Sequence, residues 1–231
     1  MLDNSKRTQH ILTMSAHVDK LAPLGEVVEM RKDTYFIKAG TKPEYCYIIK
    51  KGRIISSETY SNGKTRNGLI MTEGCILGES YLWLDEPCPT NFKTIEDSKL
   101  IRIPKQVFFD FVEENPDLYK PIIESLSKKL MSVMDELRQM AGCNVTWRIC
   151  NLLLVFAESY GKQRGKAVCI DTHLTQQHIA QMLYTNRITI VRVFKKLQEL
   201  NLITRVGNRY YITDIDALKK YMDLVAYSDK V

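Results

Sequence analysis

The stretch from Arg187 to Leu200 combines basic and apolar residues in the period of an amphipathic helix. At about 100° per residue, its apolar side chains gather on one side. These are Ile190, Val193, Phe194, Leu197 and Leu200. Arginine can donate two hydrogen bonds to guanine in the major groove, and an exposed isoleucine can contact the methyl group of thymine. We therefore predict that the other side reads DNA, through Arg187, Ile188, Thr189, Arg192 and Lys195.

The neighbouring segments predict a winged helix-turn-helix around this stretch. They are a short helix over 175–183, a turn over 184–186, and the segments 202–203 and 206–212, which together look like two strands around a Gly207-Asn208 turn. Thr175 and Gln176 begin the short helix, where backbone N–H groups attract phosphate, so we expect both to contact the DNA backbone. The alternative is a basic face that meets only solvent. The charge favours DNA, because residues 162–209 hold nine basic and two acidic side chains.

The excess positive charge lies entirely in the C-terminal part of the chain. Residues 1–142 hold 20 basic and 20 acidic side chains, and residues 143–231 hold 13 and 7, which accounts for the net charge of +6. This asymmetry predicts a neutral domain joined to one that binds a polyanion. The sequence has no run of 18 apolar residues, and its N-terminus is too polar for a signal peptide. We therefore expect a cytoplasmic protein without a membrane partner.

The first hundred residues read as a small all-β domain. Gly40, Gly52, Gly63 and Gly74 stand 11 or 12 residues apart, with Gly68 between the last two, and short apolar segments lie between them and beyond. The predicted strands cover 45–49, 53–55, 69–71 and 100–103. Ser61-Asn62-Gly63-Lys64 is a hairpin signal between two of them. Turn residues at this spacing are typical of a sandwich or barrel.

A long helix is predicted to follow this domain. Asn115-Pro116 is a start signal, with Asn as the N-cap and Pro at the first helical position, and the helix is expected to reach Gly142. Apolar residues then alternate spacings of three and four: Ile123, Leu126, Leu130, Val133, Leu137 and Met140. Such a seam favours a parallel homodimer. The alternative is one helix packed on its own domain.

Enzyme and metal chemistry find little support in the residue pattern. The six cysteines include no C-x-x-C pair and the four histidines form no ligand cluster, so we expect no metal site and no cofactor. Gly63-Lys64-Thr65 resembles the end of a P-loop, but Glu58 stands where the first glycine belongs. We expect a protein that is not an enzyme. A redox role for Cys46, Cys75 or Cys88 is a minority interpretation, because scattered cytoplasmic thiols are usually small buried side chains.

In this order and at this length, these parts resemble the CRP/FNR transcription regulators over roughly residues 25–212. The most specific segments are Gly78-Glu79, Ile103-Pro104, Asn115-Pro116-Asp117, Val145–Ile149, Leu174–Ala180 and Asn186–Arg192. The resemblance implies an α+β fold with a cyclic-nucleotide-binding-like β-roll sensor domain (1–114), a dimerisation helix (115–142) and a winged helix-turn-helix DNA-binding domain (143–231). It also implies a homodimer on a palindromic operator in double-stranded DNA, controlled by an effector in the β-roll. RNA polymerase is a candidate partner.

The predicted DNA-reading helix departs from the family pattern at Ile188. Family members usually carry a glutamate at this position, which accepts a hydrogen bond from cytosine. A branched alkyl group cannot accept from cytosine N4, but it can pack on a methyl group. We therefore expect an A·T pair opposite Ile188. Halorespiration regulators of the CprK type look similarly apolar here, which makes that branch a candidate relative.

The effector site departs from the cyclic-nucleotide binders of the family as well. The glycine and glutamate that open their phosphate-binding segment are kept, but Pro89 and Thr90 stand where an Arg-Ser pair would hold the phosphate. Val133 and Met134 occupy the helix positions that would bond to adenine, and neither side chain can do so. We therefore do not expect cAMP as the effector.

Aromatic and basic side chains around the same segment suit an aromatic or anionic small molecule instead. The predicted effector-binding set is Glu79, Tyr81, Trp83, Thr90, Lys129, Val133 and Met134. The aromatic side chains, with Phe92, could equally form the core of the β-roll. Two further alternatives are a redox- or haem-responsive regulator of the same fold, and a ligand-sensing module that does not bind DNA.

Overall fold

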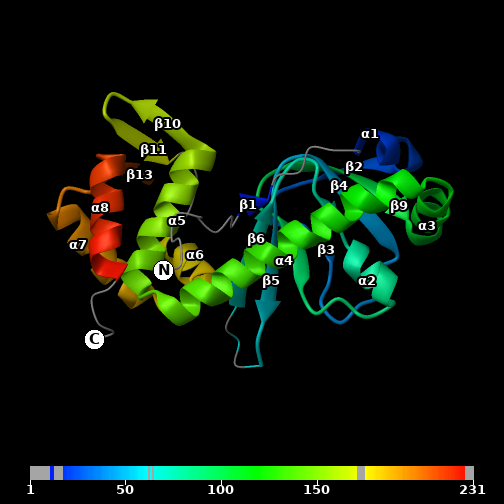
Figure 1. The fold of residues 1–231 in the computed structure, drawn as a ribbon, viewed down its shortest axis with the longest axis horizontal. Coiled ribbons are helices and arrows are strands. Elements are labelled where there is room, and N and C mark those ends of the chain that lie inside the picture. The colour runs from blue at the N-terminus through cyan, green and yellow to red at the C-terminus, as the bar shows by residue number, and fades with distance from the viewer. Residues whose placement is uncertain (1–10, 13–17, 62, 64, 171–174, 227–231) are drawn as a thin grey trace. The chain divides into compact units, whose positions relative to one another are not determined.

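The computed structural model describes residues 11–12, 18–61, 63, 65–170 and 175–226. The chain forms two compact units, an N-terminal unit over Ile11–Met131 and a C-terminal unit over Ser132–Val231 (Figure 1). The hairpin turn predicted over 61–64 lies partly outside the described residues, and Leu174 lies outside them. None of the helices in the described residues combines the length and the apolar composition that a membrane span requires.

Two β-sheets, together called the β-roll below, form the body of the N-terminal unit. One sheet has the strand order β1-β6-β5-β8-β3 and the other β2-β9-β4-β7. The strands are β1 (Ile11–Leu12), β2 (Glu26–Met30), β3 (Tyr35–Ile37), β4 (Tyr45–Lys51), β5 (Ile54–Thr59), β6 (Thr65–Met71), β7 (Ile76–Leu77), β8 (Asn91–Thr94) and β9 (Ser98–Pro104). The four predicted strand segments are confirmed, because they lie in or overlap β4, β5, β6 and β9.

Strand β4 is buried on both of its faces. Tyr47 and Ile49 pack in the core between the two sheets, whereas Cys46 and Ile48 pack in a second core formed with helices. These helices are α1 (Val18–Leu21), α2 (Glu79–Leu84), α3 (Lys105–Glu114) and α4 (Tyr119–Gly142), with short 3₁₀ helices η1 (Ala22–Leu24) and η2 (Pro116–Leu118). A strand covered on both sides must be apolar without alternation, which is why this segment is a continuous apolar run.

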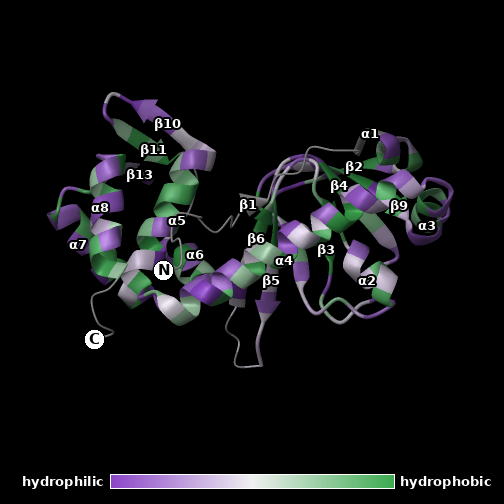
Figure 2. Ribbon diagram, in the orientation of Figure 1, coloured by the Kyte–Doolittle hydropathy of each residue, from purple (hydrophilic) through white to green (hydrophobic). Residues whose placement is uncertain are grey.

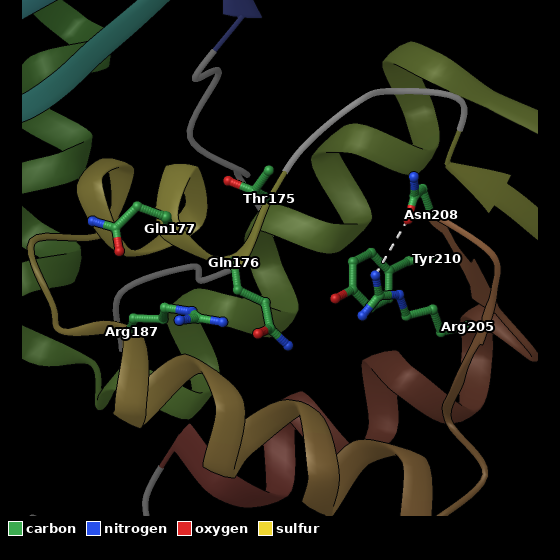
Figure 3. A pocket seen from close by; sticks show the side chains of 7 residues that line it. All are labelled: Thr175, Gln176, Gln177, Arg187, Arg205, Asn208 and Tyr210. Atoms are coloured by element: carbon green, nitrogen blue, oxygen red, sulfur yellow. Dashed lines mark hydrogen bonds between the residues drawn. The ribbon is translucent and has the colours of Figure 1, made fainter.

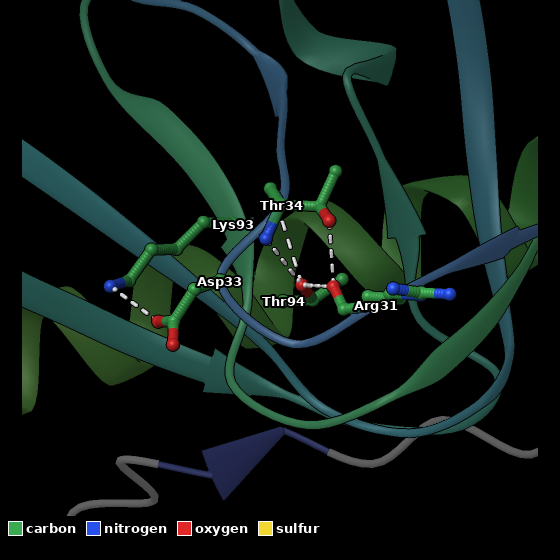
Figure 4. A network of polar contacts seen from close by, with 5 residues as sticks. All are labelled: Arg31, Asp33, Thr34, Lys93 and Thr94. Atoms are coloured by element: carbon green, nitrogen blue, oxygen red, sulfur yellow. Dashed lines mark hydrogen bonds and ion pairs between the residues drawn. The ribbon is translucent and has the colours of Figure 1, made fainter.

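Buried Thr94 on β8 ties down the turn between β2 and β3 (Figure 4). Its hydroxyl donates to the carbonyl of Arg31 at 2.6 Å and accepts from the backbone N–H of Thr34 at 2.9 Å. On the exposed side of the same turn, Lys93 forms an ion pair with Asp33 at 3.1 Å. A hydroxyl that both donates and accepts satisfies two backbone groups at once, so this turn is held rigidly against the sheet.

Gly78 sets the direction in which α2 leaves the sheet. Its φ of 88° lies in the left-handed region, and a Cβ at this position would come within 3.2 Å of the carbonyl oxygen of Tyr45. Both conditions favour glycine. The next residue, Glu79, begins α2 and is thereby placed inside the unit, where it is 1% exposed.

The long helix begins later than its sequence signal predicts. Pro116–Leu118 forms the 3₁₀ turn η2, and α4 starts at Tyr119. Asn115 does not cap α4; its side chain instead donates to the carbonyl of Phe111 at 2.8 Å and so closes α3. Leu118 is fully buried, and this anchor turns the chain between the two helices. Pro121 fits inside the first turn of α4, where backbone N–H groups have no partner in the helix.

The C-terminal unit packs helices on a small antiparallel sheet of order β10-β11-β13-β12. Its elements are α5 (Val145–Tyr160), β10 (Gly161–Arg164), β11 (Ala167–Ile170), α6 (Gln176–Met182), α7 (Arg187–Glu199), β12 (Ile203–Val206), β13 (Arg209–Ile212) and α8 (Ile215–Ala226). The strand-like run over 167–170 is β11, and the two strands around Gly207-Asn208 form the predicted wing. The hydropathy colouring shows α5 as largely hydrophobic and α4 as mixed along its length (Figure 2).

The side chain of Asn144 links the start of α5 to the end of α8. It accepts from the backbone N–H of Trp147 at 2.9 Å and so caps the start of α5. The same side chain donates to the carbonyl of Val225, near the end of α8, at 2.5 Å. One residue therefore bonds to a backbone donor at the start of one helix and to a backbone acceptor near the end of the other.

Candidate nucleic-acid interface

Helix α7 is fixed by one apolar side and leaves the opposite side in solvent. Four of the five side chains predicted to be buried are buried: Ile190, Val193, Phe194 and Leu197. The rings of Phe194 and Tyr210 meet edge to face, with centroids 4.8 Å apart, and this contact seats the helix on the wing. The fifth, Leu200, is 44% exposed, because the helix ends at Glu199 and the following residue no longer follows the helical progression.

The start of α7 is capped by Asn186, whose side chain accepts from the backbone N–H of Thr189 at 2.7 Å. This cap sets the rotation of the first turn and so directs the residues that follow it. Four of the five side chains predicted to read DNA lie exposed on this helix: Arg187, Ile188, Arg192 and Lys195. Thr189 is half-buried. Their contact with DNA stays a prediction.

The short helix α6 begins one residue later than predicted, because Thr175 is its N-cap. The Thr175 side chain accepts from the backbone N–H of His178 at 3.1 Å. Its hydroxyl hydrogen remains able to donate to an anion in front of the helix. Gln176 opens α6 and is half-buried. The two residues thus stand side by side at the position predicted for phosphate contact.

The turn between α6 and α7 is held from both sides. Tyr184 adopts a left-handed conformation with φ of 51°, and the backbone N–H of Thr185 returns to the carbonyl of Ala180 at 3.0 Å. From α5, the guanidinium of Arg148 donates to the carbonyl of Leu183 at 2.9 Å. Burial lowers the pKa of Arg148. The hydrogen bond from Arg148 links α5 to the turn and so helps to fix the angle between α6 and α7.

A pocket of about 570 Å³ opens between α6, the start of α7 and the wing (Figure 3). It is lined by Thr175, Gln176, Gln177, Arg187, Arg205, Asn208 and Tyr210. Gln176 and Arg187 lie on one side, and Arg205, Asn208 and Tyr210 lie on the other. None of these lining residues is acidic. Hydroxyl, amide and guanidinium donors facing one hollow make a site suited to an anion such as a phosphate.

Arg205 is held in place by the wing itself. Its Nε donates to the carbonyl of Gly207 at 2.9 Å, and its Nη2 reaches the side-chain oxygen of Asn208 at 3.5 Å. The guanidinium also lies 5.6 Å from the centre of the Tyr210 ring. The pocket includes four residues that the sequence pattern did not indicate: Gln177, Arg205, Asn208 and Tyr210. A basic residue two positions before the Gly-Asn turn was the signal that could have indicated Arg205.

In the β-roll, the predicted effector residue Glu79 already has a partner. Its carboxylate forms an ion pair with the ammonium of Lys129 from α4, and Ser125 donates to the same oxygen at 3.5 Å. The Lys129 ammonium also donates to the carbonyl of Ile76 at 2.7 Å. Both residues of the predicted effector set therefore lie close together, and each is the ion-pair partner of the other.

The other predicted effector residues separate into distinct places. Tyr81 packs against the core between the sheets, and burial raises its pKa although a hydrogen bond to Thr90 opposes the rise. Trp83 lies elsewhere, 40% exposed, with its ring 5.4 Å from those of Phe108 and Phe109. Phe92 belongs to the core itself. Because successive residues of α2 point in different directions, Trp83 does not join Tyr81 in one site.

Helix α4 presents most of its predicted seam to solvent. Five of the six seam residues are exposed: Ile123, Leu130, Val133, Leu137 and Met140. Leu126 is the exception, because it packs against the second core of the N-terminal unit. Met134, which belongs to the predicted effector set with Val133, is exposed as well. A run of exposed large aliphatic residues on one helix is characteristic of an interaction surface.

The cysteines are mostly buried. Cys46, Cys75 and Cys88 are fully enclosed in the N-terminal unit. Burial raises the pKa of Cys46 and Cys75, and it raises that of Cys150 to about 12. Such thiols stay protonated near neutral pH and react slowly. Among the described residues, no three His, Cys, Asp or Glu side chains lie close enough together to hold a metal ion.

Two family models match the chain. The cyclic nucleotide-binding domain matches residues 27–115, and the Crp-like helix-turn-helix domain matches residues 148–221. Among known proteins, the CRP-like cAMP-activated global transcriptional regulator of Mycobacterium tuberculosis is 22% identical over 181 residues, which cover 78% of this chain and 81% of that protein.

Solved structures agree in fold. The c-di-GMP responsive global regulator CLP of Xanthomonas campestris aligns with a TM-score of 0.77 at 17% identity, over 84% of this chain and 97% of that chain. OCPA-complexed CprK aligns with a TM-score of 0.66 at 16% identity, over 87% and 92%. The predicted fold class, a β-rich cyclic-nucleotide-binding-like unit followed by helices and a helix-turn-helix, is confirmed.

Proposed function

We propose that this chain, which belongs to the CRP/FNR family of DNA-binding transcription regulators, acts as a homodimer on a palindromic operator under the control of a small molecule. The observation that carries the proposal is the exposed basic side of α7 beside the arginine-lined pocket. A basic recognition helix needs a polyanion as its partner, and the pocket supplies donors at its edge.

In the complex, α7 occupies the major groove. Arg187 and Arg192 donate to base edges or phosphates, and Ile188 faces an A·T pair. A backbone phosphate enters the pocket, where Thr175 and Arg205 donate to it from opposite sides. Phosphate contacts of this kind fix the orientation of the helix, whereas base contacts choose the sequence.

Two copies of the chain associate through α4. Leu130, Val133, Leu137 and Met140 alternate spacings of three and four, and Ile123 lies one heptad before Leu130, which is the pattern of a two-stranded coiled coil. Pairing of these seams removes large aliphatic side chains from water and gives the two recognition helices a twofold relation. A twofold protein binds a palindromic operator, with half-sites about one helical turn apart. RNA polymerase is a candidate further partner of the DNA-bound dimer.

The effector is a small aromatic or anionic molecule other than cAMP, and no other cofactor is involved. Thr90 and Pro89 cannot make the charged bidentate contact that a cyclic phosphate requires. An anionic effector in the β-roll competes with the Glu79 carboxylate for the Lys129 ammonium. Because Lys129 belongs to α4, such competition acts directly on the helix that carries the seam.

Salt dependence of binding to random duplex DNA tests the DNA-binding part. A regulator that releases counterions from phosphates loses affinity steeply as salt rises, whereas a ligand sensor that does not bind DNA shows almost no binding at any salt concentration. Arg192→Ala should cost about 1–3 kcal/mol and relax specificity at one base pair. Lys195→Ala should weaken all sequences evenly and reduce the salt slope by about one.

Lys220→Ala on α8 is the matched control, since it removes an exposed charge outside the proposed interface. If the Arg192 and Lys195 variants bind every sequence like the parent, the assignment of α7 is wrong. Isothermal titration with cAMP tests the effector part. Micromolar binding of cAMP would overturn its exclusion.

A further inference from the structure

We propose that Ile188 and Val191 together read the C5-methyl groups of two pyrimidines, carried either by thymine or by 5-methylcytosine. The inference rests on the proposed function, because it takes α7 as the helix that enters the major groove. The two side chains form what we call the aliphatic ridge of α7. Ile188 is 81% exposed and Val191 is 42% exposed.

The ridge is not needed to hold α7 in the fold. The packing side of the helix is complete without it, because Ile190, Phe194 and Leu197 are almost fully buried. A side chain that is four-fifths exposed keeps most of its aliphatic area available for a partner. A partner that covers these two side chains removes their apolar area from water, and this burial stabilises the complex.

The spacing of the ridge matches stacked bases. Residues three apart lie on the same face of a helix, about 4.5 Å apart along its axis. Successive bases on one DNA strand rise by about 3.4 Å. Ile188 and Val191 can therefore contact methyl groups on neighbouring base pairs at the same time. The position of Ile188 in the first turn of α7 suits this, since such helices present their N-terminal residues to base edges.

The charges around the ridge indicate which kind of partner it fits. Arg187 precedes Ile188 and Arg192 follows Val191 in the sequence, and Lys195 lies one turn beyond Val191; all three are exposed. A basic rim around two aliphatic side chains is complementary to phosphates around base methyl groups. It is poorly suited to a second copy of the same basic surface, because like charges would then oppose each other.

The ridge has a chemical consequence that a hydrogen-bonding residue would not have. Isoleucine and valine side chains neither donate nor accept, so they detect the methyl group and not the base that carries it. At the contacted positions the protein should therefore prefer thymine and 5-methylcytosine over uracil and unmethylated cytosine. Methylation of cytosine within an operator would then strengthen binding at these positions.

The experiment uses the full chain and a duplex selected by it from a random pool. Each thymine of the selected half-site is replaced singly by deoxyuridine, which removes one methyl group and leaves base pairing intact. Two positions should each weaken binding about fourfold, the effect of withdrawing one buried methyl-sized group. At those positions, 5-methylcytosine paired with guanine should bind about fourfold more tightly than cytosine.

Single variants connect each position to a residue. In Ile188→Ala the deoxyuridine penalty should disappear at one position, and in Val191→Ala at the neighbouring one. Leu200→Ala is the matched control, an exposed aliphatic residue at the other end of the same helix, and it should keep both penalties.

The outcomes separate this inference from the proposed function. If a duplex is selected but every deoxyuridine is tolerated, or the penalties persist in both alanine variants, the methyl-reading role is wrong and DNA binding stands. If no duplex is selected at any salt concentration, the proposed function fails, and the methyl-reading role falls with it.

Discussion

The ion pair between Lys129 and Glu79 leads to a measurable prediction about stability. The Glu79 carboxylate is 1% exposed, and its charged partner in the structure is the Lys129 ammonium. Lys129→Ala removes this partner and also the donor that bonds to the Ile76 carbonyl at 2.7 Å. An uncompensated buried charge costs about 3–5 kcal/mol. That loss is a large share of a total stability of about 5–15 kcal/mol.

Urea unfolding measures the loss. The variant should unfold at a clearly lower midpoint than the parent, with the slope of the transition unchanged. Lys128→Ala is the matched control, because Lys128 is the exposed neighbour on the same helix, and it should change stability by less than about 0.5 kcal/mol. The double variant Glu79→Gln with Lys129→Met should regain most of the loss, because it leaves no bare charge.

Two results would refute this reasoning. A Lys129→Ala protein within about 1 kcal/mol of the parent would mean that water or another cation reaches Glu79. A double variant as unstable as the single one would mean that the packing of the lysine stem, and not its charge, holds α4 to the β-roll.

Three further predictions concern other parts of the chain. Asn144→Ala should cost about 1–2 kcal/mol in urea unfolding, because α5 loses its cap and the Val225 carbonyl loses its donor; an unchanged midpoint would contradict this. Asn201 follows α7 with φ of 53°, so Asn201→Ala should cost about 1 kcal/mol, whereas Asn201→Gly should be neutral or stabilising; equal thermal midpoints for the two variants would count against it. The pKa of Cys150 is raised from 9.0 to about 12, so its thiolate forms first in the unfolded chain. Stability from this group is therefore full below about pH 9 and falls as pH rises toward 12. At pH 8 a thiol reagent should label Cys150 far more slowly in the native protein than in denaturant, and equal rates would refute its burial.

The helix-turn-helix could be predicted from sequence because its signals are local. The apolar period of α7 and the caps Thr175 and Asn186 act within a few residues of their own positions. The apolar period wrongly predicted that Leu200 is buried, because a period does not show where a helix ends. The start of α4 was also wrongly predicted, because buried Leu118 and the bond from Asn115 to Phe111 override a standard start signal there.

The predicted effector region shows more clearly what local sequence patterns cannot predict. Tyr81 and Trp83 are two residues apart in the sequence, yet one packs on the core between the sheets and the other on α3. The charge on Lys129 suggested an anionic ligand, and the sequence did not indicate that the Lys129 ammonium forms an ion pair with the Glu79 carboxylate. Residue type indicated the kind of chemistry in both cases, and it could not indicate which partner would be nearest.

Local patterns in the sequence were enough to predict the order of parts, the recognition helix, the wing, the apolar seam of α4 and the location of the excess charge. These follow from periodicity, caps and composition, which act over one or two helical turns. Only the tertiary structure decided that Arg205 faces Arg187 across one pocket and that Lys129 meets Glu79, 50 residues away in the chain. Such pairings depend on how α4, α6, α7 and the wing pack, and packing is settled by buried contacts between distant residues that no local pattern encodes.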